Sequence, residues 1–581
     1  MKNRYKSAAF YGLLACASIN FVACGPQIDL MPWEIIDEAQ NGEEGEGGIS
    51  TGDVALEVLE GELLGGLPLM QDFDTHKYQY QRANNIDVFA GYFTVAHSVF
   101  DYGRPLLHTY DFPNGYYGGP MGESTKMYPQ IYHAYFFGEK HGVPEWKALA
   151  QIVYAYNMQG LTDIYGPVPY DDFRNRKETP PLTYISTQEV YTRILEDLEE
   201  AIGILKEAKP TAEALKRVEG PSGGLSDLDW RNWVKFANSI RLRMALNMVK
   251  ADPARAQAIA ESAVNDEIGV LRYSDKDFQM TMNGNPQHPL FQICSGWHDS
   301  RLGASLENIL KRYESPLLDK WFEKNSGPIE SNGVQMLNTG LDYVGIRQGT
   351  SVDSHITSKG YKAFSIFKDR YMPRAYLKVT EVLFNQAEGA LRGWAMGGTA
   401  QSFYEQGIRK SFEENNVSGY DEYIAREEVE EVDYVDYYKT EYSTEGRVKV
   451  GVAWDDTDTD ETKLEKIITQ KYIAIFPASL EAWTTFRRTG YPRLIPVIEK
   501  NSWADGSFDV ELQIRRIPYS TSGTATDNAN IAAVEAVIGN DSYPDANGSL
   551  ENTAGVRLWW DKPTETRVDG DPKGMIIPKN F

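Results

Sequence analysis

Apolar residues recur at spacings of three and four along much of the chain, which is the pattern of helices that bury one face. Start signals agree, since Thr187 and Glu189 open one apolar series, and Asp252 is followed by Pro253 at the first position of another. The pattern predicts helices over residues 86–99, 146–161, 188–206, 230–249, 253–262, 376–391, 403–412 and 461–488. The fold is therefore predicted to be mainly α-helical.

Two pairs of these segments have the form of helical hairpins. Residues 188–206 with 230–249, and residues 376–391 with 403–412, are pairs of the kind that stack into a tetratricopeptide-like solenoid. The residue signature of that repeat is absent, so this prediction also draws on a family resemblance carried by other motifs.

Long irregular insertions separate the helical blocks. Residues 262–370 and 415–460 are rich in Gly, Asn, Asp, Ser and aromatic side chains. Insertions of this length usually carry function or are disordered. We therefore expect a tetratricopeptide-like helical-hairpin scaffold with long irregular loop insertions, and we place ligand capture in those loops.

The beginning of the chain has the form of a secretory signal. Lys2, Arg4 and Lys6 precede an uncharged, mostly apolar stretch that is short for a membrane-spanning helix. It ends in the letters FVACG around Cys24, which resemble the lipobox of bacterial lipoproteins with Phe21 in place of the usual Leu. We predict a signal peptide over residues 1–23 and acylation of Cys24, by palmitate for example, at about 0.8 kcal/mol of membrane binding per buried methylene. The alternative is an ordinary signal peptide with a chance cysteine.

The segment behind this cysteine is predicted to be a tether. Residues 24–52 carry many acidic side chains among Gly and Gln, with few apolar residues, as flexible linkers do. Residues 53–581 are predicted to form a single ligand-binding domain, and no apolar run in them approaches the length of a membrane span. Contact with the membrane is expected through the lipid anchor only.

Charge and cysteine content narrow the function further. The net charge of −25 argues against a nucleic-acid partner, because phosphate binding requires a basic surface. With Cys16 removed in the signal and Cys24 acylated, Cys294 has no partner for a disulfide. We predict a buried structural thiol at Cys294, with a nucleophile beside His298 as the alternative.

Four segments, in order across the mature chain, carry motifs of a known family. They read GLTDIYGPVPY within residues 149–172, WVKFANSIRLRMAL at 233–246, FYEQGIRKS at 403–411 after a glutamate-bearing helix, and QKYIA, EAW and RRTGYP within 468–492. Together with the lipobox, they resemble the SusD/RagB family of nutrient-binding outer-membrane lipoproteins, and especially its SusD-like branch.

The resemblance implies a binding protein and not an enzyme. It implies a lipid-anchored lid at the outer membrane, facing the cell exterior, over a SusC-like TonB-dependent barrel that imports the captured nutrient. The cargo is expected to be a glycan or oligosaccharide, with an oligopeptide as the alternative. A non-transport surface adhesin and a surface hydrolase are the rival roles.

The charged residues of these motifs are interpreted as scaffold, because their helices also carry core residues. We expect the arginines to pair with carboxylates between stacked helices, and a ligand clamp is the alternative. The set comprises Arg241, Arg243, Arg487 and Arg488 with Glu381, Glu388 and Glu481.

Signatures of catalysis and metal binding are absent from the sequence. It has no HExxH, phosphate-loop or CxxC motif, and its histidines lack the spacing of a zinc site, so we expect no cofactor. The acidic run from Asp455 to Glu461 alternates carboxylates as a calcium loop does, but Glu461 stands where the glycine of an EF-hand belongs. We predict a solvated acidic loop there, with a surface calcium ion as the alternative.

Sugars present apolar C–H faces and a rim of hydroxyls, so their binding sites need aromatic rings and polar side chains. The family resemblance places ligand contacts in loops near the N-terminal helices and in the later insertion. The predicted ligand-binding residues in these loops are Tyr116, Tyr117, Trp297, Asp299, Tyr343 and Arg347. The alternative for each aromatic ring is packing beneath its own loop.

Overall fold

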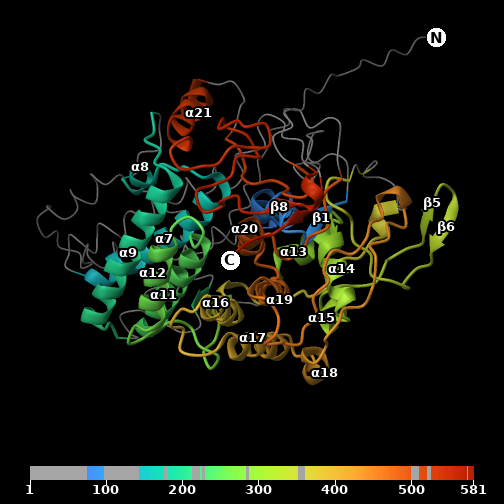
Figure 1. Cartoon of the computed structure of the whole chain (residues 1–581), viewed down its shortest axis with the longest axis horizontal. Coiled ribbons are helices and arrows are strands. Elements are labelled where there is room, and N and C mark those ends of the chain that lie inside the picture. Colours follow the sequence, from blue (N-terminus) through green and yellow to red (C-terminus); the bar gives the residue numbers. More distant parts are fainter. Residues whose placement is uncertain are drawn as a thin grey trace, which may run out of the picture. The chain divides into compact units, whose positions relative to one another are not determined.

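The structure is a computed structural model of the chain, with one compact unit over Leu59–Phe581 (Figure 1). The residues that the structure describes are 75–96, 143–175, 181–211, 223–225, 229–282, 287–350, 352, 360–498, 509–519, 525–571 and 574–581. The predicted signal and tether, with Cys24, lie outside the described residues, as do Tyr116 and Tyr117.

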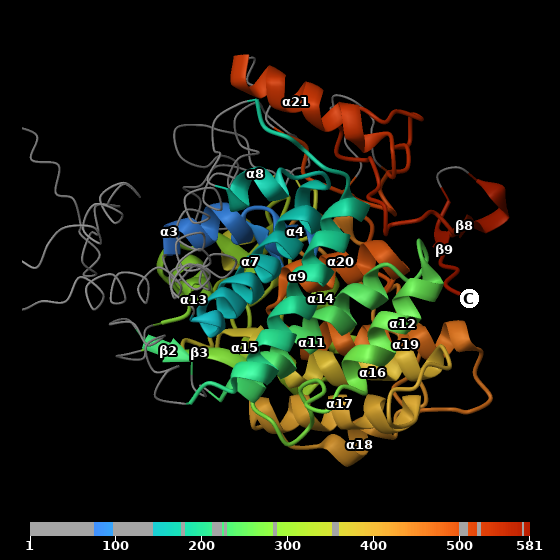
Figure 2. The ribbon, with the colours of Figure 1, turned by 90° about the vertical axis from the view of Figure 1, so that its left-hand side faces the viewer.

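Four helices lie side by side on one flank of this unit (Figures 1 and 2). They are α7 (Pro144–Tyr165), α9 (Thr187–Ala208), α11 (Trp230–Asn247) and α12 (Pro253–Val264). Helix α9 packs most extensively on α7 and also contacts α11, while α11 packs most extensively on α12. The predicted start of α12 is confirmed, because the Asp252 carboxylate accepts a hydrogen bond from the Arg255 N–H at 3.2 Å.

A second group of helices continues the scaffold toward the centre of the view in Figure 1. It comprises α16 (Val379–Leu391), α17 (Ala400–Asn415), α19 (Asp460–Ala474) and α20 (Ser479–Thr489). Helix α16 packs against α17 and α19, and it also contacts α11 of the first group. The predicted pairing of residues 376–391 with 403–412 is therefore confirmed.

The predicted helix over residues 86–99 is wrong beyond its first turn. Helix α4 spans only Ile86–Phe89, and the chain then forms strand β1 (Phe93–Val95), which pairs antiparallel with β4 (Ser300–Leu302). The turn is made at Gly91, whose φ of +76° favours glycine. A Cβ there would lie only 2.8 Å from the Gln348 side chain, so sheet pairing and close packing override the helical periodicity.

Two other predicted helices are interrupted. The segment over 461–488 is split into α19 and α20 around Pro477, which supplies no backbone N–H for a helical hydrogen bond. The segment over 376–391 begins instead as strand β7 (Ala375–Leu377), which pairs with β3 (Phe278–Met282) before α16 starts.

The remaining elements are short and lie mostly in the connections. The helices among them are α3 (Thr75–Tyr78), η2 (Gln79–Ala83), α8 (Tyr170–Arg174), α13 (Pro289–Phe291), η5 (Gln292–Gly296), α14 (Ala304–Arg312), α15 (Pro316–Trp321), η6 (Gly360–Ala363), α18 (Tyr420–Ile424), η7 (Thr440–Tyr442), α21 (Ala525–Ile538) and η8 (Val568–Gly570). The strands among them are β2 (Gly223–Leu225), β5 (Ile329–Ser331), β6 (Val334–Leu337), β8 (Thr566–Arg567) and β9 (Ile576–Ile577). Strand β2 joins β3, β5 pairs with β6, and β8 pairs with β9, all antiparallel.

An aromatic core joins the helical scaffold to the long insertion. The ring of Phe476, between α19 and α20, stacks on Trp321 at a centroid distance of 4.4 Å. It also contacts Phe93 of β1 at 5.7 Å and Phe322 at 5.8 Å. Because these rings come from distant parts of the sequence, their burial fixes the insertion onto the helices.

Buried ion pairs connect the scaffold helices, both between the two groups and within the second group. The Arg243 guanidinium on α11 donates two hydrogen bonds to Glu381 on α16, at 2.7 and 2.8 Å, and Arg488 on α20 donates two to Glu388 at 2.6 and 2.7 Å. The scaffold interpretation of these residues is therefore confirmed. Glu481 is held by Lys471 at 2.7 Å and by Arg243 at 3.4 Å.

The other two motif arginines do not follow the prediction. Arg487 lies with its guanidinium 3.5 Å from the centre of the Trp483 ring and donates to the Arg515 carbonyl at 2.7 Å. Arg241 donates to the Asn238 side chain at 2.9 Å. Both side chains therefore contribute ring packing or hydrogen bonds rather than the predicted ion pair.

Candidate functional site

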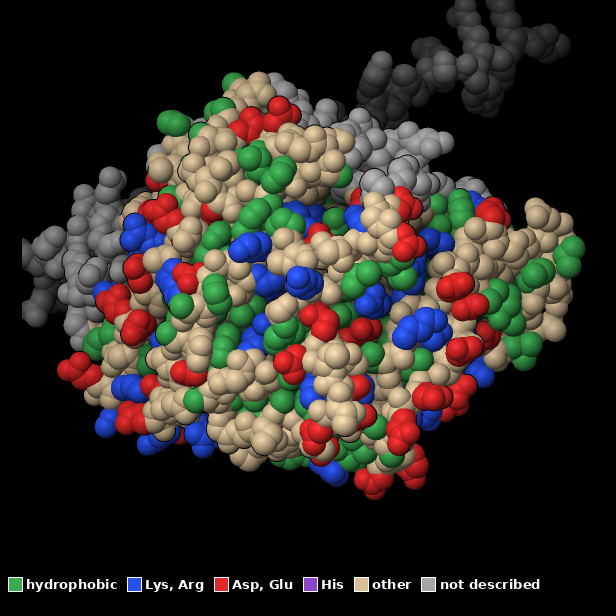
Figure 3. All heavy atoms as spheres, viewed as in Figure 1, with side chains coloured by type: hydrophobic (Ala, Val, Ile, Leu, Met, Phe, Trp, Pro, Cys, Tyr) green, Lys and Arg blue, Asp and Glu red, His purple; other side chains and the backbone are tan. Residues whose placement is uncertain are grey.

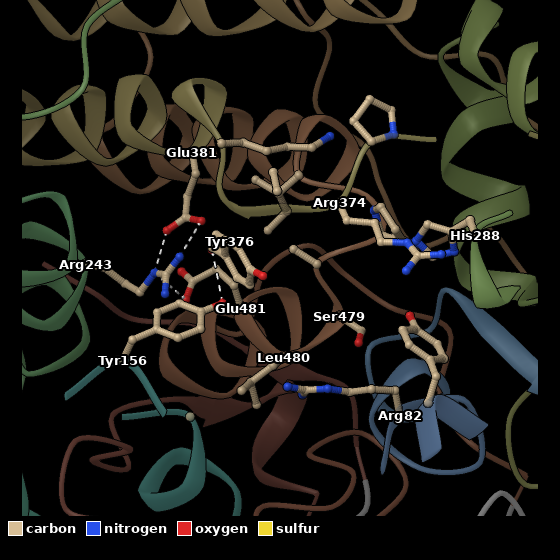
Figure 4. A pocket seen from close by; sticks show the side chains of 18 of the residues that line it. Arg82, Tyr156, Arg243, His288, Arg374, Tyr376, Glu381, Ser479, Leu480 and Glu481 are labelled. Atoms are coloured by element: carbon tan, nitrogen blue, oxygen red, sulfur yellow. Dashed lines mark hydrogen bonds and ion pairs between the residues drawn. The ribbon is translucent and has the colours of Figure 1, made fainter. Parts of the chain in front are cut away.

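A small pocket with several charged side chains in its lining lies where α11, α16 and α20 meet the N-terminal helices (Figure 4). Figure 4 shows Arg82, Arg374 and His288 on one side of this pocket and the pair of Arg243 with Glu381 on the other. Its volume is about 90 Å³, well below the roughly 300–1,000 Å³ typical of ligand sites. The pocket has room for water but not for a sugar ring.

The ionisation of this pocket does not suit acid–base catalysis. Burial favours a protonated Glu481, but Lys471 and Arg243 outweigh burial and lower its pKa. Burial, with the nearby Arg374, lowers the pKa of His288 to about 3, so that this imidazole is neutral. An anionic carboxylate that is fully engaged by cations is a poor proton donor, and the cluster is best explained as part of the scaffold.

Trp297 forms an exposed aromatic surface with a residue that sequence reasoning missed. Its ring lies 4.7 Å from that of His76 on α3, with the planes tilted by 37°. Trp297 is half-buried, while His76 and the adjacent His298 are exposed. We call His76, Trp297 and His298 the aromatic ledge, and its rings can present a face to an apolar sugar surface.

Asp299 anchors this ledge from below. Its side chain is only 7% exposed and accepts a hydrogen bond from the Gln79 amide at 2.8 Å. The Asp299 carbonyl accepts a second hydrogen bond from the Ala96 N–H at 2.8 Å. The structure thus places Asp299 beneath the ledge, where it holds the turn between η5 and β4.

The remaining two described residues of the predicted site are engaged with other segments. The Tyr343 hydroxyl donates to Asp319 at 2.5 Å, and Lys324 lies 5.6 Å from the Tyr343 ring. Arg347 donates to the carbonyls of Pro496 at 2.7 Å and of Tyr442 at 2.9 Å. Tyr343 is half-buried, and Arg347 ties the insertion to later loops.

Other predicted features can be placed as well. Cys294 is buried, and this burial raises the pKa of its thiol to about 12, so the prediction of a structural thiol is confirmed. In the acidic loop, Asp455 accepts hydrogen bonds from Thr457, and Asp458 pairs with Lys466 at 2.6 Å. Within the described ranges, no group of three or more His, Cys, Asp or Glu side chains is arranged to hold a metal ion.

No helix in the described part of the chain is both long and apolar enough to cross a bilayer.

Paired helices that support long loops define a class of helical scaffold proteins. A family model described as Susd and RagB outer membrane lipoprotein matches residues 64–561. Since this match spans most of the chain, the protein belongs to the SusD-like family of outer-membrane lipoproteins.

Solved structures of this family share the fold. A chitin-binding SusD homolog from Flavobacterium johnsoniae is 31% identical, with a TM-score of 0.74 over 87% of this chain and 99% of that chain. A SusD homolog from Bacteroides thetaiotaomicron is 29% identical, with a TM-score of 0.72 over 87% and 99%. Another from Bacteroides uniformis is 27% identical, with a TM-score of 0.74 over 88% and 99%. A search of curated proteins found no match.

The predicted family and fold class are therefore confirmed. The described helices form the paired scaffold, and helix α3 together with the turn between η5 and β4 carries the aromatic ledge.

Proposed function

We propose that this protein captures a glycan or oligosaccharide at the cell surface and delivers it to a SusC-like TonB-dependent barrel. The observation that carries the proposal is the family match over residues 64–561, together with 31% identity to a homolog that binds chitin. The exposed aromatic ledge supports it, because stacking on a sugar face needs rings that are fixed and accessible.

In this proposal the ligand lies against Trp297 and His76. The Trp297 ring supplies most of the apolar contact, while the exposed imidazoles of His76 and His298 supply hydrogen bonds to hydroxyls. Chitin oligosaccharides are the first ligands to test, since a relative binds chitin.

The predicted lipid anchor would locate glycan capture at the membrane surface. Lipid on Cys24 and a flexible tether over residues 24–52 would hold the domain at the outer membrane while leaving it free to move as a lid. No chemistry is proposed for the cargo, and the cation-paired carboxylates Glu381 and Glu481 support that view.

Co-purification tests delivery directly. The lipidated chain, carrying an affinity tag at its C-terminal end, is isolated from native outer membranes, and its partners are identified by mass spectrometry. A TonB-dependent barrel at near-equal amount is the expected result. Recovery without any barrel would contradict the delivery role and would favour an adhesin.

The cargo class is tested by the material that co-purifies. The complex is denatured, and the released small molecules are analysed for saccharide and for peptide. Saccharide supports the proposal, whereas oligopeptide would replace the glycan as cargo. Incubation of the purified chain with glycans should give no product, and turnover would contradict the binding role.

A further inference from the structure

A wide groove lies on the face shown in Figure 3, and none of the residues that line it belongs to the aromatic ledge. It is formed by the end of α11, the start of α12, the end of α16 and the last described residues, and its volume is about 630 Å³. This volume falls within the roughly 300–1,000 Å³ of small-ligand sites. We call it the basic groove, and its cationic side chains are Lys250, Arg392, Lys562 and Lys579.

The charge of the groove contrasts with that of the chain. Among the described side chains that line it, four are cationic and none is acidic, although the whole chain carries a net charge of −25. Figure 3 shows several Lys and Arg side chains, with Asp and Glu side chains among them, around the place where Figure 1 marks the C-terminal end. Lys562 and Lys579 are exposed there.

Two carboxylates beside this groove are already neutralised by guanidinium groups. Asp561 is held by Arg515 at 2.5 Å and by Arg557 at 2.9 Å. Glu388 is held by Arg488 at 2.6 Å and by Arg392 at 3.0 Å. The field of the lysines in the groove is therefore not cancelled by these acids.

The walls of the groove are fixed by hydrogen bonds. Arg392 donates to the Asn580 carbonyl at 3.3 Å, and the Asn580 N–H donates to Glu461 at 2.8 Å. Lys250 donates to the Thr564 hydroxyl at 3.1 Å, which in turn donates to the Lys579 carbonyl at 2.6 Å. A cavity that is held open in this way does not have to be ordered by its ligand.

We propose that the basic groove binds the oxyanion of an acidic sugar, a carboxylate or a sulfate ester. Lys250, Lys562 and Lys579 line the groove and would offer ammonium groups to such an anion, and Arg392 lines it as well. The Phe581 ring, 47% exposed and 4.7 Å from the Arg392 guanidinium, offers an apolar surface to the sugar ring. This site would act independently of glycan capture at the ledge.

Lys250 gives the site a pH dependence. Burial lowers its pKa to about 7, against the opposing effects of Asp561 and Glu565 and with further lowering by Arg557 and Arg488. Lys250 is therefore charged below pH 7 and loses its proton above it. An anion that contacts this ammonium is expected to bind more tightly at pH 6 than at pH 8.

The test is titration calorimetry on the whole predicted mature chain with Cys24→Ser, at constant ionic strength. The probes are trigalacturonate, its neutral methyl ester and inorganic sulfate. The variant Lys562→Gln/Lys579→Gln removes two groove charges, and Lys276→Gln/Lys449→Gln removes two charges from exposed lysines outside the groove.

Trigalacturonate is expected to bind, the ester is not, and the groove variant should weaken binding by about tenfold while the control variant changes it less than about twofold. If inorganic sulfate binds and the groove variant abolishes that binding, the result also supports an oxyanion site. It would then show that the free anion is a sufficient ligand. Lys250→Gln should remove the difference between pH 6 and pH 8, and Trp297→Ala should leave acid binding intact. Equal binding of the ester, equal loss in both double variants, or no binding at millimolar concentration would overturn the proposal.

Discussion

Gln79 donates a hydrogen bond to Asp299 at 2.8 Å across 220 positions of the sequence. This contact joins η2 to the turn after η5, and so it determines where Trp297 stands relative to His76. The aromatic ledge is thus assembled from two distant segments by a buried carboxylate beneath it. Its geometry depends on Asp299 even though that side chain faces the interior.

Asp299→Ala should weaken glycan binding without removing any ledge ring. The buried Gln79 amide loses its acceptor, at a cost of about 1–3 kcal/mol in the free energy of unfolding, and the turn that carries Trp297 loosens. Urea unfolding and glycan titration of the same samples measure both effects. Asp299→Asn keeps an oxygen acceptor and should retain most of the binding, and equal loss in both variants would contradict the anchoring role.

Arg243→Met should destabilise the scaffold strongly. It leaves the Glu381 carboxylate, which is 2% exposed, without its two guanidinium hydrogen bonds. Removing one partner of a buried ion pair typically costs about 3–5 kcal/mol. Urea unfolding monitored by tryptophan fluorescence measures the loss, and Arg243→Met/Glu381→Leu should recover much of it. A single-variant loss below about 1 kcal/mol would show that the pair is dispensable.

Glu388 should contribute stability that is lost in acid. Although burial alone would raise its pKa, Arg488 and Arg392 lower that pKa to about 2, from an ordinary value of 4.5. Because the folded-state pKa is below the unfolded one, the contribution is complete above pH 4.5 and disappears as the pH falls towards 2.

Unfolding free energies of wild type and Glu388→Gln, measured from pH 6 down to pH 2, check this linkage. The stability difference between the two proteins should shrink over that interval as the wild-type carboxylate is protonated. A difference that stays constant down to pH 2 would mean that the ion pair does not lower the pKa of Glu388.

Cys24→Ser should release the protein from membranes. Without the acylated cysteine, the chain loses the lipid through which membrane contact is predicted. Fractionation of cells and metabolic labelling with an alkyne-tagged palmitate measure anchoring and acylation. Wild type should be labelled and sediment with outer membranes, whereas labelling of the variant would disprove the lipid site at Cys24.

Local patterns in the sequence predicted the long helices well, because each one buries a face that repeats with helical spacing. The failures arose where tertiary contacts dominate. Phe93 and its neighbours are apolar at helical spacing, but the backbone pairs with Ser300–Leu302, and Gly91 breaks the helix before it. Such a partner, about 200 residues away, leaves no trace in a short window of sequence.

The candidate site was predictable only in part. Trp297 could be chosen because it stands in a long aromatic insertion, but His76 carries no local signal, since its role comes only from its contact with Trp297. Asp299 and Arg347 have the residue types of a sugar rim, yet their partners within the fold, Gln79 and the Pro496 carbonyl, determine where they point. Residue type indicates what a side chain can bind, while the fold decides what it meets.

Calorimetric titration of the mature chain with chitin oligosaccharides and a wider glycan panel, in wild type and Trp297→Ala, tests the central claim most directly. Saturable binding of at least one glycan is expected, and the variant should lose on the order of 2 kcal/mol, or about thirtyfold in affinity, with an unchanged melting temperature. Absence of binding to every glycan, or binding that is the same in Trp297→Ala, would contradict glycan capture at the aromatic ledge.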